Sequence, residues 1–113
     1  MITGIHHFSI IASSEASVTF YSNLGFCEYK RIERGYDTVV LMEGHGVGLE
    51  VFIAPSHPWP TVEPLGYRTL SLKVDCFSDS IERYEAGELK TDWNGERYVN
   101  IEDPDGNIVQ LHE

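Results

Sequence analysis

Residues 4–13 read GIHHFSIIAS, and residues 66–75 read GYRTLSLKVD. Both stretches begin with glycine, place apolar residues at matching positions, and carry a serine at the same place. Short, largely apolar runs of this kind are typical of a β-strand that packs against a core. A strand that recurs in this way indicates that the chain contains two related halves.

The residues that follow these two strands repeat as well. After each strand comes a helix-like segment with serine near its start and glycine near its end, at 13–26 and at 78–89. Each half closes with a strand that begins at glycine, at 46–52 and at 106–112. Two further strands are expected before the closing strand of each half. They are 26–34 and 36–44 in the first half, and 89–93 and 96–102 in the second.

This repeat predicts two βαβββ modules. A chain of 113 residues is long enough for one compact core and too short for two independent domains. We expect a single domain over residues 1–113, with module one at 1–54, a linker at 55–65 that holds four of the five prolines, and module two at 66–113. Neither module alone buries much core, so the two are expected to pack together, within one chain or by exchange across a homodimer.

Strand alternation places polar residues of both halves on one face of each predicted strand. We expect His6 to face the opposite side from His7. Residues that match across the repeat are expected to approach one another near a pseudo-twofold axis, around a polar-floored cup that takes a ligand. The residues predicted to line it are His7, Ser9, Glu50, Tyr67, Thr69, Ser71, Tyr98, Asn100, Gln110 and His112.

Charge and hydropathy restrict the partners. The net charge of −10 repels polyanions, so nucleic acid and anionic membranes are not expected partners. No apolar run approaches the ~20 residues of a membrane-spanning helix. The first residues, MITGIHH, lack the basic and apolar segments of a secretion signal. We expect a cytoplasmic protein with a small-molecule ligand.

Five segments resemble one known superfamily, the vicinal oxygen chelate fold of glyoxalase I, fosfomycin-modifying enzymes, extradiol dioxygenases and bleomycin-resistance proteins. They are IHHFSIIA, FYSNLGF, LEVF, GYRTLSLKV and DPDGNIVQLHE, in order along the chain. The resemblance implies an α+β fold in which two βαβββ modules form a curved, cup-like mixed sheet with the helices on the outside.

The resemblance also implies where a metal ion is held in such proteins. By position, His7 and Glu50 match two of the usual ligands. Thr69 stands where histidine is usual, and Gln110 stands where glutamate is usual. One imidazole and one carboxylate predict at most a weakly held divalent ion, such as Zn, Ni, Mn or Fe, with Gln110 or His112 as further donors. A hydrogen-bonded pair of His7 and Glu50 without metal is the competing interpretation.

Three functions are compatible with these residues. The first is a small-molecule binding protein with an incomplete metal site, akin to drug-sequestering bleomycin-resistance proteins and favouring a cationic ligand. The second is a metal-dependent lyase, isomerase or thiol transferase of the glyoxalase I-like type that uses His7 and Glu50. In that type the glutamate matched by Gln110 moves the proton, which an amide cannot do; His112 is the candidate substitute, and no catalytic residue is assigned. The third is a fold retained as an interaction module.

Overall fold

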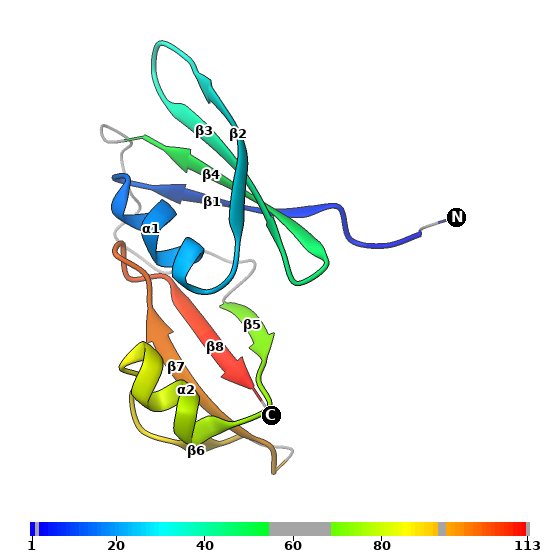
Figure 1. Cartoon of the computed structure of the whole chain (residues 1–113), viewed down its shortest axis with the longest axis vertical. Coiled ribbons are helices and arrows are strands. Elements are labelled where there is room, and N and C mark those ends of the chain that lie inside the picture. The colour runs from blue at the N-terminus through cyan, green and yellow to red at the C-terminus, as the bar shows by residue number, and fades with distance from the viewer. Residues whose placement is uncertain (2, 55–68, 93–94, 113) are drawn as a thin grey trace. The chain divides into compact units, whose positions relative to one another are not determined.

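The computed structural model describes residues 1, 3–54, 69–92 and 95–112. The chain divides into two compact units, Met1–Thr61 and Val62–Glu113, and Figure 1 shows the elements of each. Each unit holds a four-stranded mixed sheet and one helix in the order βαβββ. The predicted α+β fold of two βαβββ modules is confirmed. The predicted proline-rich linker lies outside the described residues.

The first unit contains β1 (His7–Ala12), α1 (Ala16–Asn23), β2 (Cys27–Glu33), β3 (Thr38–Gly44) and β4 (Val47–Ile53). The sheet order is β1-β4-β3-β2. Strand β1 pairs with β4 in parallel, whereas β3 pairs with β4 and β2 in antiparallel fashion. A parallel pair requires a crossover connection, and the segment from α1 to β3 provides it.

The second unit repeats this topology with β5 (Thr69–Lys73), α2 (Phe77–Tyr84), β6 (Lys90–Thr91), β7 (Arg97–Glu102) and β8 (Ile108–His112). Its sheet order is β5-β8-β7-β6, with β5 parallel to β8. The strand that corresponds to β2 is β6, and it has only two residues. The internal repeat seen in the sequence is therefore a repeat of strand order as well.

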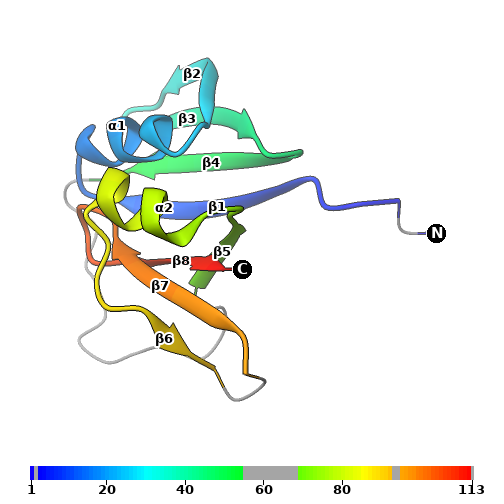
Figure 2. The ribbon, with the colours of Figure 1, turned by 60° about the horizontal axis from the view of Figure 1, so that its bottom comes forward.

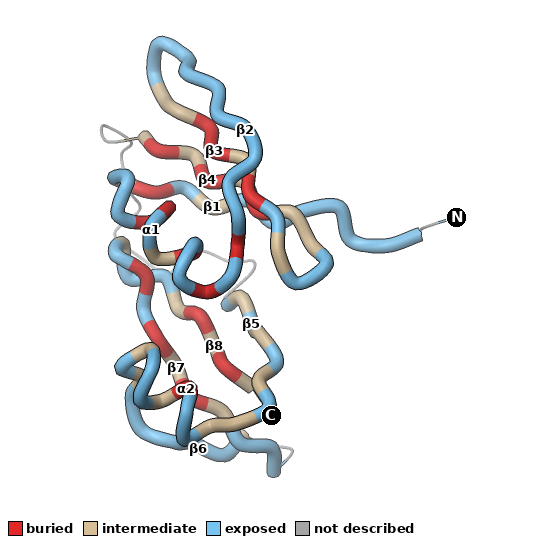
Figure 3. Tube along the Cα trace, viewed as in Figure 1, coloured by how far each residue is buried: buried red, intermediate tan, exposed pale blue. Residues whose placement is uncertain are grey.

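Alternation along the central strands puts the core of each unit on one sheet face. In the first unit Met42 pairs with Leu49, and both side chains are fully buried. Helix α1 contributes buried Val18 and Tyr21, and it lies against the sheet in Figures 1 and 2. Figure 3 shows the buried segments following these central strands. Each large apolar side chain removed from water contributes roughly 1.5–3 kcal/mol.

The second unit builds its core in the same way. Val99 pairs with Leu111, Ile101 pairs with Val109, and all four side chains are buried. Helix α2 contacts β7 and runs beside it in Figure 2. Since paired residues share a face, the other face of β7 and β8 carries Tyr98, Asn100, Gln110 and His112. The core on one face thus leaves a polar face on the other.

The helices are shorter than the segments 13–26 and 78–89 predicted. Ser14 precedes α1, and its hydroxyl accepts a hydrogen bond from the Ala16 amide at 3.2 Å. At the other end Gly25 adopts a φ of 99°, which glycine takes at little cost, and the Phe26 amide donates to the Tyr21 carbonyl at 3.1 Å. The predicted boundaries therefore included residues that cap the helix or turn the chain out of it.

Helix α2 ends at Tyr84 rather than near Gly87. Glu85 takes a left-handed conformation with a φ of 51°, and the Ala86 amide donates to the Ile81 carbonyl at 3.0 Å. In the described ranges, neither helix is long and apolar enough to cross a membrane.

Candidate functional site

A polar pair lies on the exposed face of the first sheet. His7 pairs with Gly48 and Ser9 pairs with Glu50, so these side chains share the face opposite Leu49 and Val51. The Nε2 atom of His7 lies 3.0 Å from the Oε2 atom of Glu50. Their side chains are 37% and 24% exposed. A partly shielded carboxylate thus faces an imidazole on the neighbouring strand.

The absence of a side chain at Gly48 permits the approach of β1 at this point. A Cβ atom added there meets the His6 carbonyl oxygen at 2.9 Å and the His7 Cβ at 3.0 Å. The Gly48 amide also donates to that carbonyl at 3.1 Å. Any larger residue at this position displaces the backbone that carries His7.

The expectation that His6 faces the opposite side from His7 was wrong. The Nδ1 atoms of the two rings are 2.9 Å apart, and the rings meet edge to face with centroids 5.1 Å apart. Strand β1 begins at His7, so strand alternation does not extend back to His6. Both nitrogens of the His7 ring are therefore engaged, one by His6 and the other by Glu50.

A guanidinium group also contacts this face of the first unit, which the sequence analysis did not anticipate. The Arg34 guanidinium lies 5.7 Å from the ring centroid of Phe52, and Phe52 shares the face of Glu50. It also lies 4.8 Å from the ring of Tyr36. The sequence did contain a signal for the position of Arg34. Arg34 and Asp37 flank the turn at Gly35, and oppositely charged residues at the end of a hairpin are near neighbours.

Arg34 is held in place by Asp37. Its Nε and Nη2 atoms each donate to the Asp37 carboxylate at 2.6 Å. This bidentate hydrogen bonding lowers the pKa of Asp37 and raises the pKa of Arg34. The charge of Arg34 is thus matched by Asp37 at the end of the same hairpin.

The second unit presents neutral hydrogen-bonding groups on its polar face. The Ser71 hydroxyl donates to the Gln110 side-chain carbonyl at 3.2 Å across the β5–β8 pair. Asn100 stands directly opposite Gln110 on β7, and its buried Oδ1 atom has no hydrogen-bond partner among the described residues. Thr69 pairs with Ile108 on the same face. An orphaned acceptor beside a carboxamide favours a ligand that donates hydrogen bonds.

The other predicted residues of the second unit are placed as follows. The Tyr98 ring stacks on the His112 ring, with centroids 6.3 Å apart and planes 7° apart. His112 faces two carboxylates rather than Gln110: its Nε2 lies 3.4 Å from Asp92 and its Nδ1 lies 3.5 Å from Glu96. Tyr67 lies outside the described residues. The sequence did not reveal these neighbours of His112. They come from the β6–β7 hairpin, and the pairing of β7 with β8 brings that hairpin next to His112.

The residues at the four positions implied by the resemblance do not match a closed site for a divalent metal ion. Tight zinc or nickel sites use several imidazole, thiolate or carboxylate donors that are basic and free to bind. In the first unit, His7 and Glu50 contact each other directly, and His6 engages the remaining ring nitrogen of His7. In the second unit, Thr69 offers a hydroxyl group, and the carbonyl of Gln110 already accepts from Ser71.

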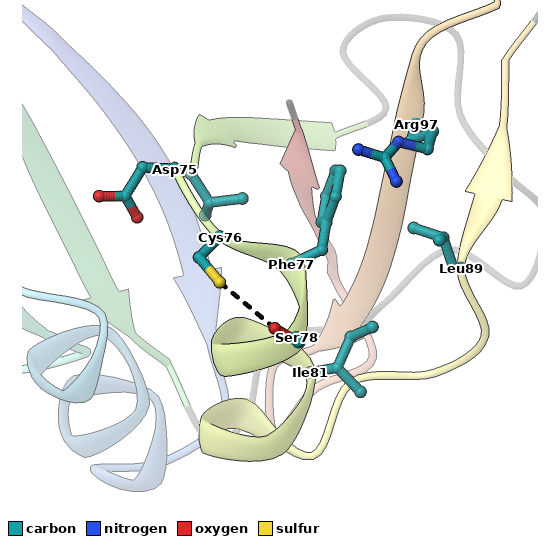
Figure 4. Close-up of a pocket in the computed structure, with 8 residues that line it drawn as sticks. Asp75, Cys76, Phe77, Ser78, Ile81, Leu89 and Arg97 are labelled. Carbon is teal, nitrogen blue, oxygen red and sulfur yellow. Dashed lines mark hydrogen bonds between the residues drawn. The ribbon is translucent and has the colours of Figure 1, made fainter.

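A cavity of about 450 Å³ lies elsewhere in the second unit, between α2 and the neighbouring strands (Figure 4). The Arg97 guanidinium lies 5.3 Å from the Phe77 ring centroid there, and the Cys76 sulfur lies 3.3 Å from the Ser78 hydroxyl. Arg97 alternates with Tyr98, so this cavity is on the helix side of the sheet and not on the face of Gln110. Its lining residues are Val74, Asp75, Cys76, Phe77, Ser78, Ile81, Leu89 and Arg97.

Solved structures with the same fold include several proteins of related description. A glyoxalase family protein from Enterococcus faecalis is 31% identical, covers 97% of each chain and has a TM-score of 0.88. A lactoylglutathione lyase from Agrobacterium tumefaciens is 21% identical over 100% of this chain and 95% of its own, with a TM-score of 0.69.

A third structure is a mutant fosfomycin resistance protein from Listeria monocytogenes in complex with Mn(II) and a dihydroxypropylphosphonic acid. It is 14% identical over 99% of this chain and 93% of its own, with a TM-score of 0.74. A search of curated proteins found no match. The model of the Glyoxalase/Bleomycin resistance protein/Dioxygenase superfamily matches residues 4–111. The chain therefore belongs to this superfamily, as the resemblance of its five segments indicated.

Proposed function

We propose that this chain is a small-molecule binding member of its superfamily with an incomplete metal site. The observation that carries the proposal is the chemistry at the family's ligand positions. His7 and Glu50 form a direct pair, and Gln110 is a carboxamide whose carbonyl accepts a hydrogen bond from Ser71. These groups suit recognition of a polar ligand better than tight retention of a divalent ion.

The proposed ligand is cationic and donates hydrogen bonds. Glu50 provides a negative charge on the polar face of the first sheet, and the net charge of −10 adds a field of the same sign. The buried Oδ1 atom of Asn100 provides an acceptor on the polar face of the second sheet. The residues proposed to contact the ligand are Ser9, Tyr67, Thr69, Ser71, Tyr98, Asn100 and Gln110.

The competing function is a metal-dependent reaction of the glyoxalase I-like type. It requires a group that takes and returns a proton at the position of Gln110, and a carboxamide does not act as a base at any usable pH. His112 is on the same sheet face, but its ring nitrogens are turned toward Asp92 and Glu96. The residues at these positions therefore favour binding over this chemistry.

The proposal includes two features beyond the ligand. Members of this superfamily are often dimeric, which supports the homodimer that the sequence predicts. The cytoplasmic location predicted from the sequence is kept as part of the same proposal. Light scattering on the purified chain measures the first of these.

The ligand class is tested by calorimetric titration with bleomycin, a cationic glycopeptide, and with fosfomycin, an anionic phosphonate. We expect bleomycin to bind more tightly than fosfomycin. The Glu50→Gln variant is expected to weaken bleomycin binding by about tenfold, because it removes a partly buried charge of the ligand's opposite sign.

Glu33→Gln is the matched control for net charge. Glu33 pairs with Thr38, which pairs with Ile53, so it belongs to the opposite face of the first sheet. An equal loss in both variants contradicts a role for Glu50 and assigns the effect to the overall charge. Fosfomycin binding as tightly as bleomycin rules out the cationic class.

A further inference from the structure

We propose that the second unit binds a divalent transition-metal ion through Asp92, Glu96 and His112. Each of these residues offers one ligand atom, and the three atoms lie within 4.8 Å of one another. The set shares no residue with the His7 and Glu50 pair. It also differs from Thr69 and Gln110, which occupy the superfamily's positions in this unit.

The two carboxylates are positioned by hydrogen bonds between Asp92 and Glu96, where the β6–β7 hairpin enters and leaves its turn. The Asp92 amide donates to the Glu96 carbonyl at 2.8 Å, and the Glu96 amide donates to Asp92 Oδ1 at 2.9 Å. Gly95, with a φ of 82°, closes the turn by donating to the Asp92 carbonyl at 3.1 Å. One oxygen of Asp92 is thus fixed by the backbone, which directs the other oxygen toward His112.

The imidazole is brought to this hairpin by strand pairing. His112 is the last residue of β8 and pairs with Tyr98 on β7, two residues after Glu96. The Tyr98 ring stacks on the imidazole with its plane inclined by only 7°. The Oε2 atom of Glu96 lies 3.5 Å from the Nδ1 atom of His112, so the carboxylate and the imidazole are direct neighbours. The β6–β7 hairpin therefore supplies two of the donors, and β8 supplies the third.

The contacts within this set favour a cation. Nε2 of His112 faces Asp92 Oδ2 at 3.4 Å, and Nδ1 faces Glu96 Oε2 at 3.5 Å. A neutral imidazole has one N–H and one lone pair, whereas carboxylate oxygens offer only lone pairs. One of the two contacts therefore places a lone pair against a lone pair unless a proton or a metal ion lies between the groups.

The spacing and the donor types favour a metal ion. Both distances exceed the 2.9–3.0 Å typical of an N–H···O hydrogen bond, and they are close to the roughly 3.4 Å between two ligands of a tetrahedral ion with bonds of about 2.1 Å. One imidazole with two carboxylates suits zinc or nickel better than magnesium or calcium, which prefer oxygen ligands alone. The exposed side chain of Glu96 leaves a path for the ion from solvent.

The proposal is tested by titrating the full chain with zinc chloride in a calorimeter, with magnesium chloride as the comparison. We expect a single zinc site of micromolar affinity and no heat from magnesium. His112→Asn and Glu96→Gln are each expected to weaken zinc binding by about tenfold or more. In a nitrogen-15 NMR spectrum, zinc is expected to shift a ring nitrogen of His112.

Two control variants separate this site from other binding. Glu102→Gln removes an exposed carboxylate from the opposite end of β7, and His7→Asn removes an imidazole from the first unit. Both are expected to keep the wild-type affinity. Zinc affinity that falls with His7→Asn but not with Glu96→Gln overturns the proposal, as does the absence of zinc binding in the wild-type chain. In either case His112 is a protonated imidazolium that faces Asp92 and Glu96, and no metal ion lies between them. Glu96→Gln is exposed, so it provides the test even where His112→Asn fails to fold.

Discussion

The double variant Thr69→His/Gln110→Glu is expected to bind nickel or zinc about a hundredfold more tightly than the parent chain, because two strong donors each add about tenfold or more. The substitutions place an imidazole and a carboxylate at the two superfamily positions where this chain has neutral side chains. Gln110→Glu also replaces a carbonyl that accepts from Ser71 with a charged carboxylate at the same place. Calorimetric titration measures the gain.

This experiment is done in the His112→Asn background, so that metal bound by Asp92 and Glu96 does not contribute. The matched control is Thr38→His/Asn23→Glu, which replaces a threonine by histidine and a carboxamide by glutamate in the first unit instead of the second. We expect no gain from the control. A double variant that binds no better than its parent contradicts the assignment of Thr69 and Gln110 to the ligand positions.

Asp103→Ala is expected to lower the free energy of unfolding by about 1–3 kcal/mol, because it removes the side-chain acceptor of two backbone amides in a partly buried turn. Asp103 is 4% exposed. Its Oδ1 accepts from the amides of Asp105 at 3.0 Å and Asn107 at 2.8 Å, and its Oδ2 accepts from the Asn107 side chain at 2.8 Å. Urea denaturation followed by circular dichroism measures the loss.

Two further variants sharpen this prediction. Asp103→Asn keeps the shape and one acceptor oxygen, so its cost is expected to be about half as large. Glu102→Ala changes the exposed neighbour and is expected to stay within about 0.5 kcal/mol of the parent. Equal losses for Asp103→Ala and Glu102→Ala contradict the account of this turn, which connects β7 to the strand that carries Gln110.

The sequence predicted most of the fold because the strands show their period directly. The glycine-led segments of both halves became β1 and β5, and the closing segments became β4 and β8. Among the described residues, alternation failed at His6, because His6 precedes β1 and its ring contacts that of His7. Helix ends were predicted poorly, because caps and left-handed residues such as Glu85 do not change the apolar period.

The side-chain contacts of the candidate residues were harder to predict from the sequence than the strands that carry them. The sequence could place Glu50 and His7 on the same side of their strands, but the 3.0 Å contact depends on the register of β1 with β4. The contacts of His112 with Asp92 and Glu96 depend on two separate strand pairings and on the closure of a hairpin. Such contacts join residues far apart in the chain, and no local pattern reports them.

Metal analysis of the purified protein shows whether the superfamily's metal positions are incomplete in this chain. The His112→Asn protein is purified without chelator, and its bound metal is measured by mass spectrometry beside the His7→Ala/His112→Asn protein. An incomplete site is expected to retain far less than one equivalent of divalent metal per chain in both proteins. A full equivalent that is retained by the first and lost by the second contradicts this expectation.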